Sequence, residues 1–304
     1  AFDAEFLSPV GFGALMGILK NYEAINPFVS STTDSLNRLK PGYEAPVCIV
    51  TSLGHSPAEP SRNRTILIGL VRDAKSALAT RFELRAPNPK TNTYLVLAAA
   101  YMAMLDGIKA ALTAEKTPKE LEASLSKKYG EEDFYLEKDR EYRSERDVFE
   151  DFTEEERQKL FGRAPATVWE NLQGFADYPE KVAAISGEGV ITPISLESYK
   201  DSILSQWKTE LHNRIIPNYM GEVRECVRLH GEDATDYDID NWLEIQRLRV
   251  HIAKNSLEAK CLLTRAAEAL DNNDFALASD LQIELSQKME LLRARYLNYK
   301  RNLF

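Results

Sequence analysis

The sequence has little that would support a disulfide framework or a zinc site. It contains three cysteines, an odd number with no CxxC pair, and four widely scattered histidines. Cysteine usage of this kind favours a reducing compartment, so we expect a cytoplasmic protein. The patterns GxxxxGK[ST] and GxGxxG are both missing. A nucleotide site would therefore have to be built without a glycine-rich phosphate loop.

An excess of positive charge and a long uninterrupted apolar run are also missing. The chain has 47 acidic and 38 basic residues, which gives a net charge of −9. Nucleic acids and anionic membranes attract basic surfaces, so this balance argues against both as general partners. No uninterrupted apolar run reaches the ~18–20 residues that a membrane-spanning helix needs. The opening AFDAEFLSP does not have the pattern of a signal peptide.

The first 115 residues combine short β-rich runs with helical segments. Runs at residues 47–50, 65–71 and 81–86 are rich in β-branched residues and bounded by Gly and Pro, which is typical of strands in one sheet. Asn92 is a suitable N-cap for the following helix. That helix is apolar on nearly all sides, so we expect it to be buried. The pattern predicts one sheet with packed helices.

The rest of the chain is charged and then helical. Residues 131–159 are dense in both signs, with interleaved aromatics. A solvated helix face is the simpler interpretation, and a partner-docking surface is the alternative. Helices are expected from Pro193, from near Asp236 and after the turn at 271–274. Their apolar stripes predict a long hairpin or bundle over residues 201–304, separate from a first domain over residues 1–200. The expected buried positions are Ile203, Leu204, Trp207, Leu211, Trp242, Leu243, Leu248, Ile252, Leu277, Leu281, Leu285, Met289, Leu292 and Tyr296.

Residues 34–94 carry the residues of chemical interest. A Pro- and Gly-containing loop separates Arg38 from Glu44, and Arg64 opens a strand. Further on, Arg81, Glu83 and Arg85 alternate along a strand, which sends all three side chains to one face of the sheet. Aimed at a ligand, they offer bidentate donors for carboxylate or phosphate and one oxygen ligand for a divalent cation. A solvated ion-pair ladder is an equal alternative, and the spacing alone identifies no reaction.

Three motifs in this region resemble a known family. They are RLKPGYEAPV at 38–47, SRNRT at 61–65 and RFELRAPNPKTNTYLVLAAAYMAMLDGI at 81–108. In order and approximate spacing they look like the C-terminal part of the catalytic domain of glutamine synthetases, which implies an α+β fold with an antiparallel sheet and packed helices. A fainter likeness continues from residue 169, so that the resemblance covers roughly residues 8–215. The helical C-terminus beyond it is longer than the family usually has.

The resemblance implies an ATP-dependent glutamate–ammonia ligase that works through γ-glutamyl phosphate with Mg²⁺ or Mn²⁺. Glutamate, ammonium and ATP would be its ligands, and the full-length protein would be a large homo-oligomer. By matching motif positions, Arg38 and Arg85 would hold the carboxylates of glutamate. Glu44 would close the glutamate site and help to deprotonate ammonium. The match places Arg64 between substrate and transferring phosphate, Arg81 at the nucleotide and Glu83 on a metal ion.

The sequence also departs from the family pattern. Gly69 stands where an ATP-facing arginine is usual, and Leu78 stands where a lysine is usual. Arg72 or Lys75 would have to compensate. The N-terminal domain and most metal ligands of the family are not in this sequence, so we expect a C-terminal fragment that is inactive alone. Two alternatives stay open: a ligase that joins glutamate to another amine, and a non-catalytic regulatory or assembly module.

Overall fold

A computed structural model of the chain describes residues 5–37, 39, 48–72 and 79–302. The chain divides into two compact units, Ala1–Lys200 and Asp201–Phe304.

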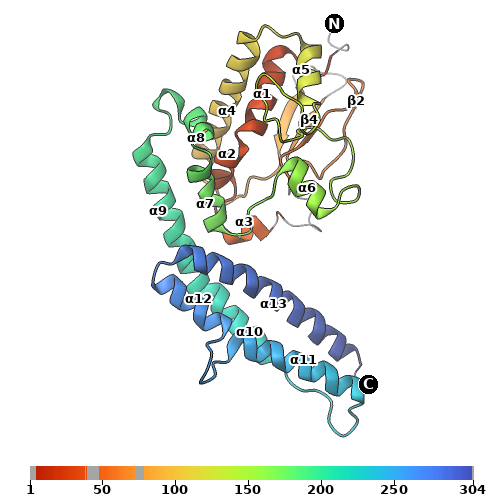
Figure 1. The fold of residues 1–304 in the computed structure, drawn as a ribbon, viewed down its shortest axis with the longest axis vertical. Coiled ribbons are helices and arrows are strands. Elements are labelled where there is room, and N and C mark those ends of the chain that lie inside the picture. The colour runs from red at the N-terminus through yellow and green to blue at the C-terminus, as the bar shows by residue number, and fades with distance from the viewer. Residues whose placement is uncertain (1–4, 38, 40–47, 73–78, 303–304) are drawn as a thin grey trace. The chain divides into compact units, whose positions relative to one another are not determined.

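The first unit combines helices with a small sheet, as expected for an α+β fold (Figure 1). Many of its helices begin at a residue whose side chain accepts a backbone N–H. Ser8, Asn92, Thr117, Thr153 and Thr167 all do so. Its helical segments are α1 (Pro9–Lys20), α2 (Tyr22–Val29), α3 (Thr33–Asn37), α4 (Thr93–Thr113), α5 (Pro118–Leu125), α6 (Glu154–Phe161), α7 (Val168–Asp177), α8 (Pro179–Ile185) and the 3₁₀ turn η2 (Gly187–Gly189).

Helices α1 and α4 touch along their backbones because glycines face each other. A β-carbon on Gly17 would overlap the carbonyl oxygen of Ala103, and one on Gly107 would overlap that of Gly13. Small residues four apart on one helix allow this close approach. The GALMG segment at residues 13–17 therefore fixes how α1 and α4 pack.

The N-cap prediction at Asn92 is confirmed, since its side chain accepts from the N–H groups of Tyr94 and Leu95. The expectation that α4 is buried on all sides is wrong. Tyr94 is 86% exposed and Tyr101 63% exposed, and Leu97 and Leu112 are about half exposed. By length and composition alone α4 could cross a membrane, although only 33% of its most apolar window is buried in the structure. In this unit α1 covers one side of α4 and leaves an apolar outer side.

The sheet has the order β1–β4–β5, with β1 (Thr51–Ser52), β4 (Ile68–Val71) and β5 (Arg81–Leu84). The predicted strands at 65–71 and 81–86 are confirmed in part, but residues 48–50 precede β1 and are not in a strand. Strands β4 and β5 pair antiparallel as expected, whereas β1 and β4 pair parallel. The parallel pairing arises because a hairpin, β2 (Gly54–Ser56) with β3 (Glu59–Pro60), returns the chain between them.

The charged stretch before α6 is not the continuous helix that its composition suggested. Residues 126–153 contain no helix, and α6 spans only Glu154–Phe161. Acidic side chains in this stretch accept backbone N–H groups nearby, as Asp133 does from Tyr135 and Leu136. Asp147 does the same from Phe149 and Glu150. Such local bonds compete with helix hydrogen bonds and hold the chain in turns.

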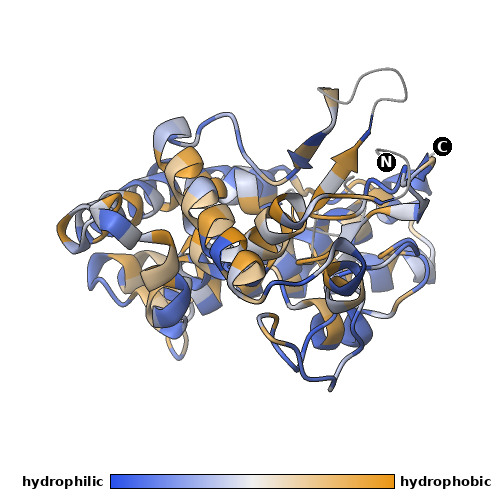
Figure 2. Cartoon of the chain, turned by 90° about the horizontal axis from the view of Figure 1, so that it is seen from above, coloured by the Kyte–Doolittle hydropathy of each residue, from blue (hydrophilic) through white to orange (hydrophobic). Residues whose placement is uncertain are grey.

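The second unit is helical throughout, as predicted. It comprises the end of α9 (Pro193–Glu210), the π-helical turn η3 (Leu211–Ile215), α10 (Ile216–Glu225), α11 (Asp236–Ala253), α12 (Leu262–Asp271) and α13 (Phe275–Arg301). The starts at Pro193 and Asp236 are confirmed. In Figure 2 hydrophobic and hydrophilic residues both occur along the helices, as amphipathic packing requires.

Helix α13 packs on α11 and α12. In its core the indole N–H of Trp207 donates to Oε1 of Gln282 at 2.8 Å, and both side chains are buried. Nine of the expected core positions are confirmed, and five are corrected. Leu243 and Leu277 are exposed, and Trp242, Leu248 and Tyr296 are only half-buried. On α11 the polar residues Asp238 and Asn241 are buried instead, with Ile245 and Ile252.

Candidate functional site

The predicted Arg-x-Glu-x-Arg trio lies on β5 and directly after it. Strand β5 pairs with β4 so that Glu83 is opposite Gly69 and Arg81 is opposite Val71. The backbone N–H of Arg85 continues this ladder to the carbonyl of Leu67. Residues directly opposite in an antiparallel pair share a face, so the trio shares the Gly69 face, as the alternation predicted.

Arg85 is the best fixed member of the trio. Its Nη1 donates to the backbone carbonyl of Asn63 at 2.6 Å, and its Nη2 lies 3.8 Å from Oε2 of Glu83. The Arg85 side chain is 17% exposed, whereas that of Glu83 is 50% exposed. Burial lowers the pKa of Arg85; the charge of Glu83 acts against this shift and that of Arg64 adds to it. An arginine stays protonated despite such shifts, so Arg85 is a cation whose position is fixed by its contacts with Asn63 and Glu83.

Gly69 provides the space for that cation. A β-carbon at residue 69 would lie 2.9 Å from Nη2 of Arg85 and 3.4 Å from its Cζ. The first distance is shorter than real β-carbon contacts, and the second is at the lower limit of ordinary van der Waals contact. The guanidinium of Arg85 therefore lies across β4 at the place where a residue 69 side chain would begin.

The loop at residues 146–148 supports the backbone segment that accepts the hydrogen bond from Arg85. The Asn63 side chain donates to the carbonyl of Arg146 at 2.9 Å and accepts from the N–H and hydroxyl of Thr65. The Thr65 hydroxyl in turn accepts from the N–H of Val148 at 3.1 Å. Residues 146–148 thus hold the Asn63 carbonyl in position, and sequence reasoning assigned them no such role.

A cavity of about 420 Å³ opens beside Arg85. Arg62 and Arg72 also line it, so three arginines border one hollow. Nη1 of Arg72 donates to the carbonyl of Glu5 at 3.2 Å. Arg64, Arg81 and Glu83 are exposed and are not among the lining residues. Glu59 lines the hollow as well, so three guanidinium groups stand against one carboxylate. This excess of guanidinium groups suits carboxylate or phosphate oxygens.

The comparisons with known proteins agree with these motifs. The family profile described as "Glutamine synthetase, catalytic domain" matches residues 2–133. The glutamine synthetase of Clostridium saccharobutylicum is 40% identical over 123 residues, which are 40% of this chain and 25% of that protein. The glutamine synthetase of Escherichia coli K12 is 44% identical over 93 residues, which are 31% of this chain and 18% of that protein.

Residues 2–133, fewer than half of the 304 residues, are thus similar to the catalytic domain of the glutamine synthetase family. The chain spans between 18% and 25% of the length of these curated relatives. Among solved structures, a cryoEM structure of Plasmodium falciparum glutamine synthetase resembles it with a TM-score of 0.44 and 20% identity. That likeness covers 66% of this chain and 39% of the other.

The six residues that the glutamine synthetase resemblance selects are not all described. Arg38 and Glu44 lie outside the described residues, as do Leu78 and Lys75. Of the described four, Glu83 and Arg85 are ion-paired, and Arg64 is close enough for its charge to act on Arg85. Arg81 is exposed on the same face, with Nη1 donating to the carbonyl of Ala79 at 3.3 Å. Their roles in a glutamine synthetase reaction stay predictions.

The Mg²⁺ or Mn²⁺ of a glutamine synthetase site needs several oxygen ligands. Within residues 5–37, 39, 48–72 and 79–302, no group of three or more His, Cys, Asp or Glu could hold a metal ion. Glu83 offers a single carboxylate. The described residues therefore do not fit a complete metal site.

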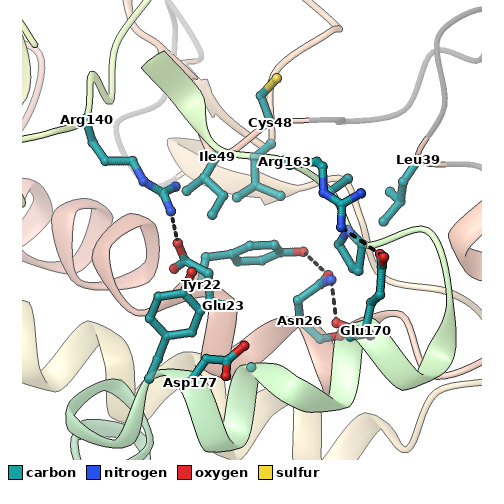
Figure 3. A pocket seen from close by; sticks show the side chains of 16 residues that line it. Tyr22, Glu23, Asn26, Leu39, Cys48, Ile49, Arg140, Arg163, Glu170 and Asp177 are labelled. Carbon is teal, nitrogen blue, oxygen red and sulfur yellow. Dashed lines mark hydrogen bonds and ion pairs between the residues drawn. The ribbon is translucent and has the colours of Figure 1, made fainter. Parts of the chain in front are cut away.

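A second pocket, of about 250 Å³, was missed by sequence reasoning (Figure 3). Glu23 on its wall pairs with Arg140 and, at 3.0 Å, with Nζ of the buried Lys181. Lys181 also lies 2.7 Å from Oε1 of Glu137. These charges bond to one another, so the cluster fixes helix α8 to α2. The available signal was Glu23, a charge within an otherwise buried helix.

Proposed function

We propose that the protein containing this chain is an ATP-dependent ligase that joins glutamate to ammonia through γ-glutamyl phosphate. The observation that carries the proposal is the fixed pair of Arg85 and Glu83 on one sheet face, within a segment of the glutamine synthetase family. The chain would contribute one part of the site. The remaining ligands, including most of those for Mg²⁺ or Mn²⁺, would come from elsewhere in the full-length protein.

Each described residue has a role that its chemistry allows. Arg85 would bind a carboxylate of glutamate, because a guanidinium already held by Asn63 loses little freedom on binding. Arg64 would stabilise the negative charge that develops during phosphoryl transfer. Arg81 would contact the nucleotide, and Glu83 would supply one oxygen to the metal ion. Metal ions, when bound, neutralise the phosphate oxygens in such reactions.

The two residues outside the described part complete the proposal. Arg38 would bind glutamate beside Arg85, and Glu44 would take a proton from ammonium. By motif position Glu44 lies where the glutamine synthetase family handles ammonium, which is why ammonia is preferred here as the substrate. The full-length protein is proposed to be a homo-oligomer, as the family resemblance implies.

The proposal is tested by phosphate release from the full-length protein with ATP, Mg²⁺ and glutamate. Ammonium is compared with a panel of primary amines. Turnover with ammonium is the expected result. Turnover with amines alone would show that an amine, and not ammonia, is the acceptor. No turnover with any acceptor would favour the non-catalytic module, an alternative that the glycine at residue 69 also supports.

Two variants connect the activity to the site. Arg85→Lys retains the charge but loses the planar donor pair, so kcat/KM for glutamate should fall by about 10²-fold. Arg214→Lys is the matched control, because Arg214 lies in the second unit, is 45% exposed and pairs with Glu210 four residues before it. Equal kcat/KM values for glutamate in both variants would show that Arg85 is not part of the site.

A further inference from the structure

Helix α11 in the second unit has an apolar side that is partly exposed. Its inner side contributes Ile245 and Ile252, which are fully buried. Its outer side carries Ile239, Leu243 and Val250, which are 42%, 49% and 45% exposed. Intervals of four and seven residues place these three side chains in one stripe, because an α-helix repeats every 3.6 residues.

The stripe borders a hollow in the surface. The hollow measures about 470 Å³. It is lined by residues 243, 246, 247, 250 and 251 of α11, by Lys254, and by residues 256 and 259–261 of the connection to α12, so that Arg247 and Lys254 border it together with Leu243 and Val250. Leu257, in the same connection, is fully exposed. An apolar stripe beside a hollow is a surface that another helix can cover.

Charges run alongside the stripe and are divided by sign. Asp236 and Asp240 lie in the first two turns of α11, while Arg247 lies near its end and Lys254 directly follows it. At 100° per residue all four fall within one helix flank, next to the apolar residues. Glu244 lies between these two groups and pairs with Arg247 of the same helix at 3.4 Å. The surface is therefore acidic along the first half of α11 and basic from Arg247 onward.

This division of charge selects the partner. A second α11 laid antiparallel on the first brings each acidic end against a basic end, whereas a parallel one brings like charges together. The same two-fold arrangement sets Ile239 of one copy beside Val250 of the other. A two-fold interface must be complementary to itself, and this pattern meets that requirement.

We propose that the outer face of α11 is a two-fold interface with a second copy of this chain. The two α11 helices run antiparallel, with Leu243 near the centre of the contact. Flanking pairs form between Asp240 and Arg247 and between Asp236 and Lys254 of opposite copies. The proposal rests on the second unit alone and does not depend on the proposed ligase activity.

Sedimentation equilibrium of the 304-residue chain tests the proposal first. The apparent mass should rise with concentration from 34.4 kDa towards twice that value. Leu243→Glu should raise the dimer dissociation constant by at least about tenfold, because it buries an unpaired charge at the centre of the contact. Leu291→Glu is the control, since Leu291 is similarly exposed, at 42%, on α13. A wild-type chain that stays monomeric at every concentration overturns the proposal.

Charge reversal tests the antiparallel arrangement. The pair Asp236→Lys and Asp240→Lys, or the pair Arg247→Glu and Lys254→Glu, should each weaken the dimer because like charges then face each other. All four changes in one chain restore opposite charges and should restore the dimer. A fourfold variant that stays monomeric while circular dichroism shows a folded chain contradicts the arrangement.

A cross-link provides a measurement that does not depend on those variants. Ile239→Cys and Val250→Cys chains are mixed and oxidised, and the native cysteines are buried. A disulfide between the two different chains should form faster than one between identical chains. Equal rates, or no cross-link, would exclude the proposed register.

Discussion

The guanidinium of Arg85 lies across β4 so closely that a β-carbon at residue 69 would be 2.9 Å from its Nη2. Gly69 thus has a structural role beyond the absence of the arginine that is usual at this position in glutamine synthetases. It allows Arg85 to rest against the sheet, bonded to the carbonyl of Asn63. The substitution and the placement of Arg85 are one structural feature.

Gly69→Ala is predicted to displace Arg85 without unfolding the chain. The guanidinium is the far end of a flexible side chain, so the free energy of unfolding should change by less than about 1 kcal/mol. In the full-length protein, KM for glutamate should rise several-fold while kcat changes less. Steady-state kinetics measure both, and Gly231→Ala is the control, because nothing lies within 4 Å of a β-carbon there. Unchanged KM in Gly69→Ala would show that Arg85 does not bind the substrate.

Removing the buried cation Lys181 should destabilise the first unit strongly. Its Nζ lies 3.0 Å from Glu23 and 2.7 Å from Glu137, and its side chain is 1% exposed. Lys181→Met leaves two carboxylates short of a partner in the interior, at a cost of about 3–5 kcal/mol. Urea unfolding followed by tryptophan fluorescence measures the change. Lys138→Met, which breaks an exposed pair with Glu132, should have little effect.

Gln282→Leu is predicted to leave the Trp207 indole N–H buried without an acceptor. The expected loss is about 1–3 kcal/mol of unfolding free energy in the helical unit. Thermal unfolding measured at 222 nm checks it. Gln287→Leu makes the same change at an exposed position of α13 and serves as the control. Equal melting temperatures would mean that this hydrogen bond contributes nothing net.

Acid should destabilise the first unit through two partly buried carboxylates. Burial alone would raise the pKa of Glu137, but the charges of Lys181 and Arg140 and its hydrogen bonds outweigh this and lower it. Burial also opposes ionisation of Glu145, and hydrogen bonds from Ser52, Arg143 and the N–H of Gly54 again lower the pKa.

Because the folded pKa of each lies below its unfolded value near 4.5, their contribution is complete above that pH. It is lost as the pH falls through the folded values. Urea midpoints measured from pH 7 to pH 3 should decrease below about pH 4.5. Glu145→Gln should flatten this decrease, and a midpoint that stays constant to pH 3 in the wild-type chain would contradict the prediction.

Several elements follow from the sequence because local chemistry decides them. Asn92 and Thr235 have side chains that accept N–H groups two or three residues ahead, and each precedes a helix. The order Arg-x-Glu-x-Arg places three side chains on one strand face whatever surrounds the strand. The similarity of residues 2–133 to the glutamine synthetase family also follows from sequence motifs, because it needs only residue identity and order.

Other features depend on which elements pack together, and no residue carries that information alone. Leu243 and Tyr101 are of residue types that are common in protein cores, but both are exposed. Each helix has only as much buried surface as its neighbours cover. Lys181 has the composition of a surface residue but is buried, because Glu23 and Glu137 arrive from distant segments to pair with it. In the sequence Gly69 shows only that an arginine is missing at this position. In the fold the absent side chain leaves the space that Arg85 occupies. The sequence determined local conformation and residue chemistry. Burial, pairing and shared space were decided only when distant segments met, since desolvation and Coulomb energies depend on the neighbours that the tertiary structure supplies.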